Sequence, residues 1–171
     1  MLVEHPLKPI YNSESKVLIL GTMPSIKSRE RNFYYAHPQN RFWKTLSKVF
    51  DEPIGETNEE RINFLLTNHI ALFDVLKSCD ISSSSDSTIK NPIPNDLTPI
   101  LKESKIKTIF TTGKKAYSLY QKYCYPKTNI KAILLPSPSP ANCPKGIEEK
   151  LYNEYSKIKD YISSWQFIHL W

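Results

Sequence analysis

The chain is poor in the residues from which common cofactor and metal sites are built. Its 171 residues include four glycines, and they contain neither a Gly-x-Gly-x-x-Gly dinucleotide motif nor a phosphate-binding Gly-Lys-Ser/Thr loop. The three cysteines, Cys79, Cys124 and Cys143, are too far apart for a Cys-x-x-Cys pair or a four-cysteine metal site. No two of the four histidines have metal-ligand spacing. We therefore expect neither a cofactor nor a bound metal.

Long apolar runs are absent as well. No stretch approaches the roughly 20 apolar residues that a membrane-spanning helix requires. Glu4 and His5 interrupt the short apolar stretch at the N-terminus, which is untypical of a signal peptide. An odd number of scattered cysteines fits a reducing compartment. We expect a soluble cytoplasmic protein without a membrane partner, associated with the nucleoid if the organism is a bacterium.

The chain does have an excess of positive charge. Lys and Arg number 23 against 17 Asp and Glu, which gives a net charge of +6. Such an excess fits a face that binds nucleic acid, because each phosphate contact releases counterions, but an ordinary lysine-rich surface has the same composition. The length suits one domain over residues 1–171, which we expect to be monomeric. The polar tract Ser82–Ser87 predicts a mobile surface loop.

Short apolar runs alternate with amphipathic segments along the chain. The runs at 17–20, 108–111 and 132–135 are typical of buried strands, and the run at 71–76 is either a strand or a buried turn. Helical patterns cover 42–50, a segment opening at Thr57, a segment capped by Asn95 or Asp96, a segment opening at Gly113, and about 147–162. This alternation predicts an α/β fold, with three α/β/α layers and a short, mostly parallel central sheet.

Two loops that follow predicted strands carry the most informative residues. The first has Gly-Thr-Met-Pro-Ser at 21–25 and Tyr-Tyr-Ala-His-Pro-Gln-Asn-Arg-Phe-Trp at 34–43. The second has Leu-Pro-Ser-Pro-Ser-Pro-Ala-Asn at 135–142. Loops at the carboxyl ends of parallel strands line the crevice where ligands bind, so we expect these two loops to face one another. Their composition suits a nucleotide better than a metal or a small acid.

Within these loops several residues have both a structural and a functional interpretation. Alternating proline and serine makes a stiff arch whose serine N–H and O–H groups can bind phosphate oxygens, or alternatively a polyproline-like connector. Asn40 directly precedes a helical pattern, and local reasoning favours a role as a helix cap over a chemical role. Tyr34 and Tyr35 are either core residues or platforms on which a base stacks.

Together the blocks resemble the uracil-DNA glycosylase superfamily. Residues 21–25 and 35–43 are similar to the mismatch-specific uracil and thymine glycosylases, and residues 135–142 are similar to the hypoxanthine (deoxyinosine) DNA glycosylase branch. The segments 71–79 and 94–96 also resemble that branch. The resemblance implies a monofunctional enzyme of base-excision repair that binds DNA containing deaminated bases. Such an enzyme flips the base out of the duplex, hydrolyses its N-glycosidic bond and leaves an abasic site.

The resemblance also implies roles for individual residues, and it shifts the balance for Asn40 toward catalysis. Tyr35 matches an aromatic residue that stacks on the flipped base. The candidate site residues are Asn40 for catalysis; Gly21, Thr22, Met23, Tyr35 and His37 for base binding; and Pro24, Ser25, Ser137, Ser139, Pro140 and Asn142 for DNA binding.

Two departures from the uracil-specific relatives favour hypoxanthine as the substrate. Met23 stands where those relatives have Asp or Asn, and either Ser137 or Leu135 stands where other relatives have a histidine that binds the base. The alternatives are a uracil or mismatch glycosylase of the same fold, or a non-catalytic module that binds nucleic acid or nucleotides.

Overall fold

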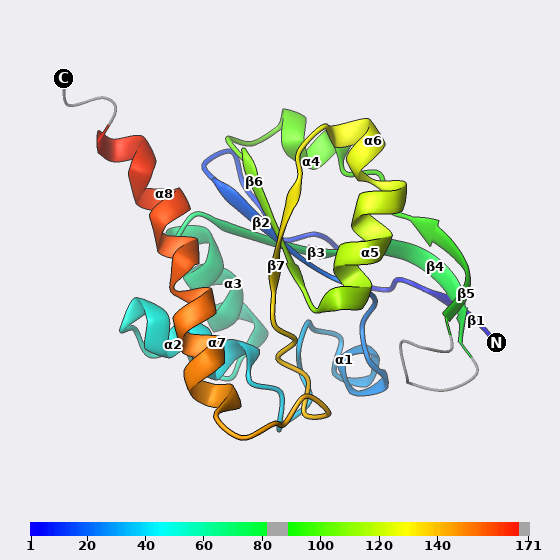
Figure 1. Cartoon of the computed structure of the whole chain (residues 1–171), viewed down its shortest axis with the longest axis horizontal. Coiled ribbons are helices and arrows are strands. Elements are labelled where there is room, and N and C mark those ends of the chain that lie inside the picture. The colour runs from blue at the N-terminus through cyan, green and yellow to red at the C-terminus, as the bar shows by residue number, and fades with distance from the viewer. Residues whose placement is uncertain (82–88, 168–171) are drawn as a thin grey trace.

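The structure, a computed structural model, describes residues 1–81 and 89–167; the predicted loop Ser82–Ser87 lies outside the described residues. A four-stranded parallel sheet runs through the molecule in the order β3-β2-β6-β7 (Figure 1). Its strands are β2 (Val17–Gly21), β3 (Ile70–Asp74), β6 (Thr108–Thr112) and β7 (Ala132–Leu135). The predicted strands are therefore confirmed, and the run at 71–76 belongs mostly to a strand.

Helices cover both faces of this sheet. On one side lie α2 (Phe42–Phe50), α3 (Asn58–Thr67), α7 (Ile147–Tyr155) and α8 (Lys157–Phe167). The other side carries α5 (Lys114–Tyr123), which continues into α6 (Tyr125–Thr128) (Figure 1). Every residue of β2 and β3 is buried, as expected for parallel strands covered on both faces. The predicted α/β/α layering is confirmed.

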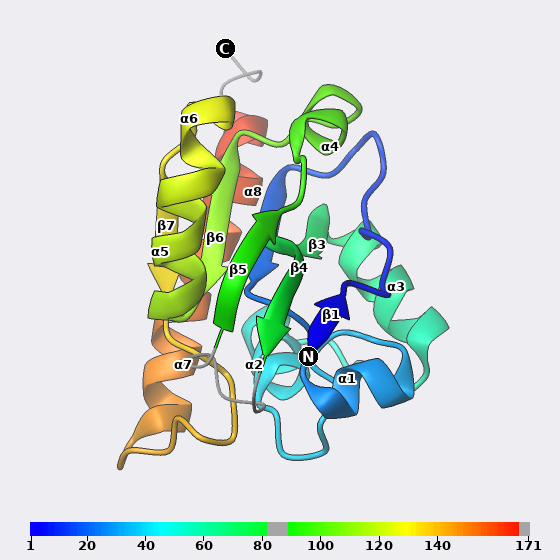
Figure 2. The ribbon, with the colours of Figure 1, turned by 90° about the vertical axis from the view of Figure 1, so that its right-hand side faces the viewer.

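A second, smaller sheet was not predicted. It is antiparallel in the order β1-β4-β5, with β1 at Leu2–Glu4, β4 at Leu76–Ile81 and β5 at Ile89–Pro94 (Figure 2). β5 contains Pro92 and Pro94, which argue against a strand because proline cannot donate to a neighbouring strand. The prolines are tolerated because β5 lies at the edge of its sheet.

Helix ends agree with local chemistry in most places. Thr57 caps α3, where its hydroxyl accepts from the Glu60 N–H at 3.1 Å, and Gly113 precedes α5 with φ of +94°, a value that favours glycine. The N-cap of α4 (Thr98–Lys102) is Leu97, so neither Asn95 nor Asp96 is the cap, although Asp96 accepts from the Thr98 N–H at 3.0 Å. The short helix α1 (Ile26–Arg31) was not predicted.

The prediction of a single last helix over 147–162 is wrong. The structure has two separate helices, α7 and α8, which meet at Ser156. The Ser156 hydroxyl donates to the Tyr152 carbonyl at 2.6 Å. A serine that bonds to the carbonyl four residues earlier often bends a helix. The apolar periodicity that continues through this point gave no indication of the break.

Candidate active site

The loops at the carboxyl ends of the parallel strands lie at the lower end of the sheet in Figure 1. Their residues line a cleft of about 810 Å³. The first loop and the Pro-Ser loop both contribute to its wall, and Asp74 and Thr112 contribute from the ends of β3 and β6. Every site residue predicted from the sequence lines this cleft: Gly21, Thr22, Met23, Pro24, Ser25, Tyr35, His37, Asn40, Ser137, Ser139, Pro140 and Asn142. The expected meeting of the two loops is therefore observed.

Asn40 bonds to the start of a helix with one end of its side chain. Its Oδ1 atom accepts from the Phe42 N–H at 2.9 Å, at the first turn of α2. The N-cap position of α2 is Arg41, so the prediction that Asn40 is the N-cap is wrong by one residue, although its side chain does bond to the first helical N–H. Nδ2 has no hydrogen-bond partner among the described residues. One amide can therefore hold the helix and still offer a donor to a ligand in the cleft.

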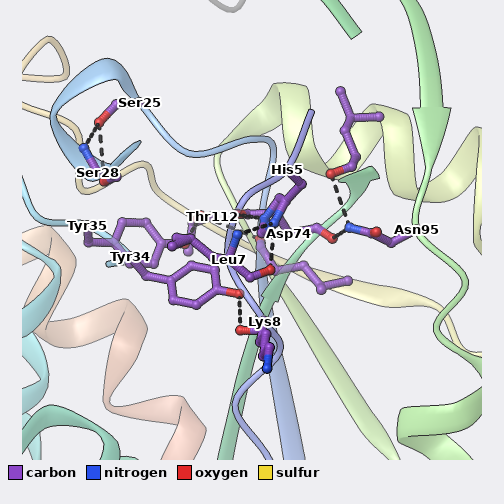
Figure 3. Close-up of polar contacts among 12 residues, drawn as sticks. His5, Leu7, Lys8, Ser25, Ser28, Tyr34, Tyr35, Asp74, Asn95 and Thr112 are labelled. Atoms are coloured by element: carbon purple, nitrogen blue, oxygen red, sulfur yellow. Dashed lines mark hydrogen bonds and ion pairs between the residues drawn. The ribbon is translucent and has the colours of Figure 1, made fainter. Parts of the chain in front are cut away.

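The two neighbouring tyrosines have different environments. Tyr34 is a core residue that is 3 % exposed, and its hydroxyl donates to the Lys8 carbonyl at 2.6 Å (Figure 3). Tyr35 lines the cleft with φ of +51°, and one face of its ring stacks on Phe42 with 3.9 Å between centroids. Only the other face and the edge of Tyr35 can meet a ligand. Both tyrosines border the cleft, but Tyr34 is buried in the core with its hydroxyl bonded to Lys8, so Tyr35 is the better candidate for a stacking platform.

The Tyr35 hydroxyl is polar but stays uncharged. It lies 2.9 Å from the Thr112 Oγ1 atom (Figure 3). Burial raises the pKa of Tyr35 far above its ordinary value, and the negative charge of Asp74 raises that pKa further. The phenol therefore keeps its proton throughout the range in which proteins work, so it can donate a hydrogen bond.

Other residues of the first loop form hydrogen bonds to neighbouring backbone groups of the same loop. His37 Nδ1 accepts from the Gln39 N–H at 3.0 Å, so the neutral ring carries its hydrogen on Nε2. Ser25 caps α1, where its hydroxyl oxygen accepts from the Ser28 N–H at 3.1 Å (Figure 3). Met23 is partly buried against the core, so no carboxylate or amide projects from that position.

The Pro-Ser loop is stiffened by bonds between its own members. Ser137 Oγ accepts from the Ser139 N–H, and Ser139 Oγ accepts from the Ala141 N–H, each at 3.2 Å. Asn142 closes the loop by donating from Nδ2 to the Ser137 carbonyl at 2.8 Å. The Ser139 N–H predicted to face a phosphate is thus used internally. The serine hydroxyl hydrogens remain as donors because each hydroxyl oxygen accepts in these bonds.

Of the two residues that match the family histidine in sequence, Ser137 is the one that lines the cleft. Leu135 ends β7 and is fully buried, whereas Ser137 lines the cleft. Close packing fixes this placement, because a Cβ atom on Gly113 would lie 3.3 Å from the Ser137 Cβ.

Arg41 joins the two loops, a role that sequence reasoning missed. Its backbone N–H donates to the Pro138 carbonyl at 3.0 Å. Its guanidinium reaches the carbonyls of Ser139 at 3.4 Å and Asn142 at 3.3 Å. The sequence showed Arg41 beside Asn40, but nothing local indicated partners about a hundred positions away.

Three other residues at the cleft also escaped sequence reasoning. Asp74 is 4 % exposed, and its Oδ2 lies 2.7 Å from the Nε2 of His5 (Figure 3). Thr112 bonds to Tyr35, as described above. Arg29 lines the cleft with a buried Nε that has no hydrogen-bond partner among the described residues. Asp74 lies in the block at 71–79 that resembles the hypoxanthine branch, which was the one available indication.

A larger neighbouring cavity of about 1030 Å³ shares Tyr35, His37 and Asn40 with the cleft. Its remaining wall mixes both signs of charge, with Lys44 and Lys48 beside Asp51 and Glu52. Mixed charge suits a polyanion poorly, so the cleft between the two loops is the better candidate site.

Over residues 1–81 and 89–167, no three histidine, cysteine or acidic residues gather closely enough to hold a metal ion. In the same part of the chain, no helix combines the length and the apolar character needed to cross a membrane.

Comparison with known proteins assigns this architecture to a family. The family model of the uracil DNA glycosylase superfamily matches residues 9–159. The chain belongs to this superfamily. The family resemblance of the sequence blocks is thereby confirmed, and DNA is the substrate class of such a glycosylase.

Individual relatives agree with this assignment. A hypoxanthine DNA glycosylase from Methanosarcina barkeri is 32 % identical over 111 residues, which cover 63 % of this chain and 70 % of that protein. One from Methanosarcina acetivorans is 30 % identical over 118 residues, covering 67 % and 74 %. The solution NMR structure of a candidate uracil DNA glycosylase from M. acetivorans matches with a TM-score of 0.77 and 26 % identity, over 93 % of this chain and 99 % of that one.

Proposed function

We propose that this glycosylase removes hypoxanthine from deoxyinosine in DNA, leaves an abasic site, and uses no metal or organic cofactor. The observation that carries the proposal is the arrangement of the cleft. The Nδ2 donor of Asn40, the Tyr35 ring and the Ser137 hydroxyl meet there, whereas Met23 fills the position of a water-positioning carboxylate. Similarity to two proteins named hypoxanthine DNA glycosylase supports the same substrate.

The reaction needs a flipped nucleotide, a stabilised leaving base and a water molecule. Flipping costs a few kcal/mol, which contacts to the DNA backbone must offset. The serine hydroxyls of the Pro-Ser loop and the Arg29 guanidinium are the groups available for phosphate oxygens. Tyr35 offers the base its free ring face, and stacking on Phe42 from behind holds the ring in place.

Catalysis depends on the charge that develops as the N-glycosidic bond breaks. The water oxygen bonds to C1′, the C1′–N9 bond breaks with its electron pair leaving on the base, and a proton from the water ends on the base. Negative charge therefore builds on the purine, and neutral donors fixed in a partly buried cleft stabilise that charge. Asn40 Nδ2 and His37 Nε2 are the donors of this kind on the first loop.

Uracil is the second candidate substrate, because a similar fold belongs to a candidate uracil DNA glycosylase. Two features weigh against efficient uracil release: Met23 offers no hydrogen bond to water, and Ser137 replaces the histidine of other relatives.

The test is base release from matched duplexes that contain deoxyinosine, deoxyuridine or no lesion, with alkaline cleavage of abasic sites and with a chelator present. We expect cleavage at deoxyinosine alone. Cleavage mainly at deoxyuridine would keep the enzyme class but replace the substrate. Binding of all three duplexes without cleavage would favour a non-catalytic module, and inhibition by the chelator would contradict a metal-free mechanism.

A further inference from the structure

The larger cavity beside the cleft contains a guanidinium that the mechanism above does not use. Arg61 lies in the first turn of α3, and its guanidinium carbon is 5.0 Å from the centre of the Trp43 ring. Its Nε atom is buried and has no hydrogen-bond partner among the described residues. A buried donor without a partner raises the free energy of the protein, so a ligand that accepts from this group is favoured.

A second arginine adds positive charge at the same place. Arg31 ends α1 and lines the cavity together with Arg61. Burial lowers the pKa of Arg61, the charge of Glu56 opposes that shift, and the positive charge of Arg31 lowers the pKa further. Neither arginine forms an ion pair over residues 1–81 and 89–167. The two like charges therefore repel one another, and an anion bound by both would relieve the repulsion.

The two lysines in the cavity wall have partners on α7. Lys44 Nζ lies 3.7 Å from Glu148 Oε1, and Lys48 Nζ lies 4.6 Å from the centre of the Tyr152 ring. The arginines are therefore the cations of this wall that are available to a ligand within the described part of the chain.

The acidic residues of the wall do not neutralise the arginines by direct contact. Glu52 accepts from Asn68 Nδ2 at 3.1 Å. Asp51 and Glu56 are exposed, and neither forms an ion pair among the described residues. An exposed carboxylate is hydrated and screened by salt, so a ligand that contacts the arginines directly can compete with both acids.

The size and position of the cavity favour an extended anion over a free ion. Its volume is about 1030 Å³, whereas one water molecule takes about 30 Å³ of liquid. Tyr35, His37 and Asn40 line both the cavity and the cleft, so the first loop is a common wall. A DNA strand with one nucleotide in the cleft carries a phosphate at every neighbouring nucleotide, and it can continue past this wall into the cavity.

Guanidinium chemistry matches a phosphodiester. The planar fork of N–H groups binds two phosphate oxygens at once, and stacking on an aromatic ring fixes the plane of the fork. Trp43 provides that ring for Arg61, and Trp43 is itself held by a hydrogen bond from Nε1 to the Tyr34 carbonyl at 3.0 Å. The fork of Arg61 is therefore positioned before a ligand arrives.

We propose that Arg61 and Arg31 bind a backbone phosphate of the strand that carries the lesion, beyond the flipped nucleotide; this inference rests on the proposed function in that the substrate is DNA. The contact holds the strand beside the cleft and lies away from the reacting atoms. Because it is made to the backbone, it carries no sequence information and contributes equally to damaged and undamaged DNA. Glu56 competes with the phosphate for Arg61.

Arg61→Met removes the charge and keeps an unbranched side chain over Trp43. Binding of a deoxyinosine duplex and of an undamaged duplex is measured by fluorescence anisotropy at several KCl concentrations. Affinity for both duplexes should fall about 10-fold or more at low salt. The slope of log affinity against log salt concentration should become shallower by about 1. An unchanged slope and affinity would overturn the proposal.

Two further variants control for folding and for overall charge. Arg31→Gln changes an exposed residue and should shift affinity and slope in the same direction, so the proposal is still tested if Arg61→Met does not fold. Lys131→Met removes one charge from an exposed position just before β7, at the end of the sheet opposite the cleft (Figure 1). It should leave affinity and slope nearly unchanged. Equal effects of Lys131→Met and Arg61→Met would reduce the role of Arg61 to net charge.

Glu56→Gln should have the opposite effect. Loss of the competing carboxylate leaves Arg61 to the phosphate, so DNA affinity should rise a few-fold at low salt. Unchanged or weaker binding, together with a lower urea midpoint, would show that Arg61 serves Glu56 and the fold instead of DNA.

A neutral methylphosphonate placed at each position of the lesion strand in turn identifies the phosphate. At one position the loss of affinity from the methylphosphonate and the loss from Arg61→Met should fail to add, because both changes remove the same contact. Additive losses at every position would overturn the proposal. If inorganic phosphate also raised the thermal midpoint of the wild type but not of Arg61→Met, the site would be one for free phosphate.

Failure of this inference is distinguishable from failure of the proposed function. Wild-type protein that shows the Arg61-dependent salt slope but releases no hypoxanthine would overturn the proposed function alone. Wild-type protein that releases hypoxanthine, with the same slope and affinity in Arg61→Met, would overturn the phosphate site alone. Wild-type protein that binds no DNA would overturn both.

Discussion

The rim and the floor of the cleft are built in different ways. The rim consists of His37, Asn40, Ser137 and Ser139, whose polar atoms are held by bonds to residues two positions away. The floor consists of Gly21, Asp74 and Thr112, with His5 behind it, and its bonds join residues 69 and 77 positions apart. Local bonds leave the rim hydroxyls and amides able to donate outward. Long-range bonds in a buried place hold the floor rigid, which is what discrimination between bases requires.

Removing the rim amide should have the largest effect. Asn40→Ala is expected to lower base release by about 100- to 1000-fold, because a donor to the leaving base is lost. It should also cost about 1 kcal/mol of unfolding free energy through the lost hydrogen bond to the Phe42 N–H. Single-turnover kinetics and urea unfolding measure the two effects.

Asn40→Asp is the matched control for that variant. Its carboxylate can still accept from the Phe42 N–H, so stability should be retained while release is lost. Full activity in Asn40→Asp would remove the amide from the chemistry.

Adding a methyl group to the floor at Gly21 should have the next largest effect on base release. Gly21→Ala places a Cβ within 2.6 Å of Asp74 Oδ1, and overpacking of this kind costs about 1–3 kcal/mol. We expect slower hypoxanthine release with DNA affinity nearly unchanged, since the rim is not altered. Gly55→Ala, where the contacts are to the flexible Glu60 side chain, is the control. Equal loss of release in both variants would contradict the account of the floor.

Tyr35 lies where rim and floor meet, and its ring should matter more than its hydroxyl. Tyr35→Ala should weaken binding of lesion-containing DNA by about 1–3 kcal/mol, the scale of stacking between a base and an aromatic ring. Tyr34→Phe removes a hydroxyl from the core and should leave DNA binding unchanged. Titration of both variants with a deoxyinosine duplex measures this, and unaltered affinity in Tyr35→Ala would assign Tyr35 to the core.

Loosening the rim should have a smaller effect. Arg41→Ala removes the guanidinium bonds to the Pro-Ser loop, each worth about 0.5–1.5 kcal/mol. We expect faster hydrogen exchange at residues 137–142 and DNA affinity lowered a few-fold, with selectivity between bases retained. Loss of selectivity in this variant would show that rim and floor are not independent.

A rise in pH from 7 to about 9 should have the smallest effect. Burial raises the pKa of Cys124 to about 11 and raises the pKa of Tyr35 and Tyr155. The unfolded chain therefore loses protons from these groups at lower pH than the folded chain does. Stability should be flat between pH 7 and about pH 9 and fall above it. Urea midpoints that rise with pH above that value would contradict this assignment.

The parts of the molecule that follow local patterns could be predicted from the sequence. The apolar runs became the parallel strands, and the loops after them met at one cleft because parallel strands end at the same edge. The rim residues were found for the same reason, since their motifs are contiguous. The roles predicted for them stay predictions.

Apart from Gly21, the floor could not be predicted, because its contacts depend on the fold. Nothing near His5 in the sequence indicates a contact with Asp74. The contact depends on the second sheet, in which β1 pairs with β4, and this sheet was not predicted. Prolines in β5 argued against a strand that its edge position permits.

The most direct test of the account is a competition measurement. A duplex carrying one deoxyinosine and one deoxyuridine in equivalent contexts is incubated with the protein, and the free bases are quantified by mass spectrometry over time. The account predicts that hypoxanthine is released and that uracil and adenine stay in the DNA. Release of uracil ahead of hypoxanthine, or release of adenine at a comparable rate, would contradict it.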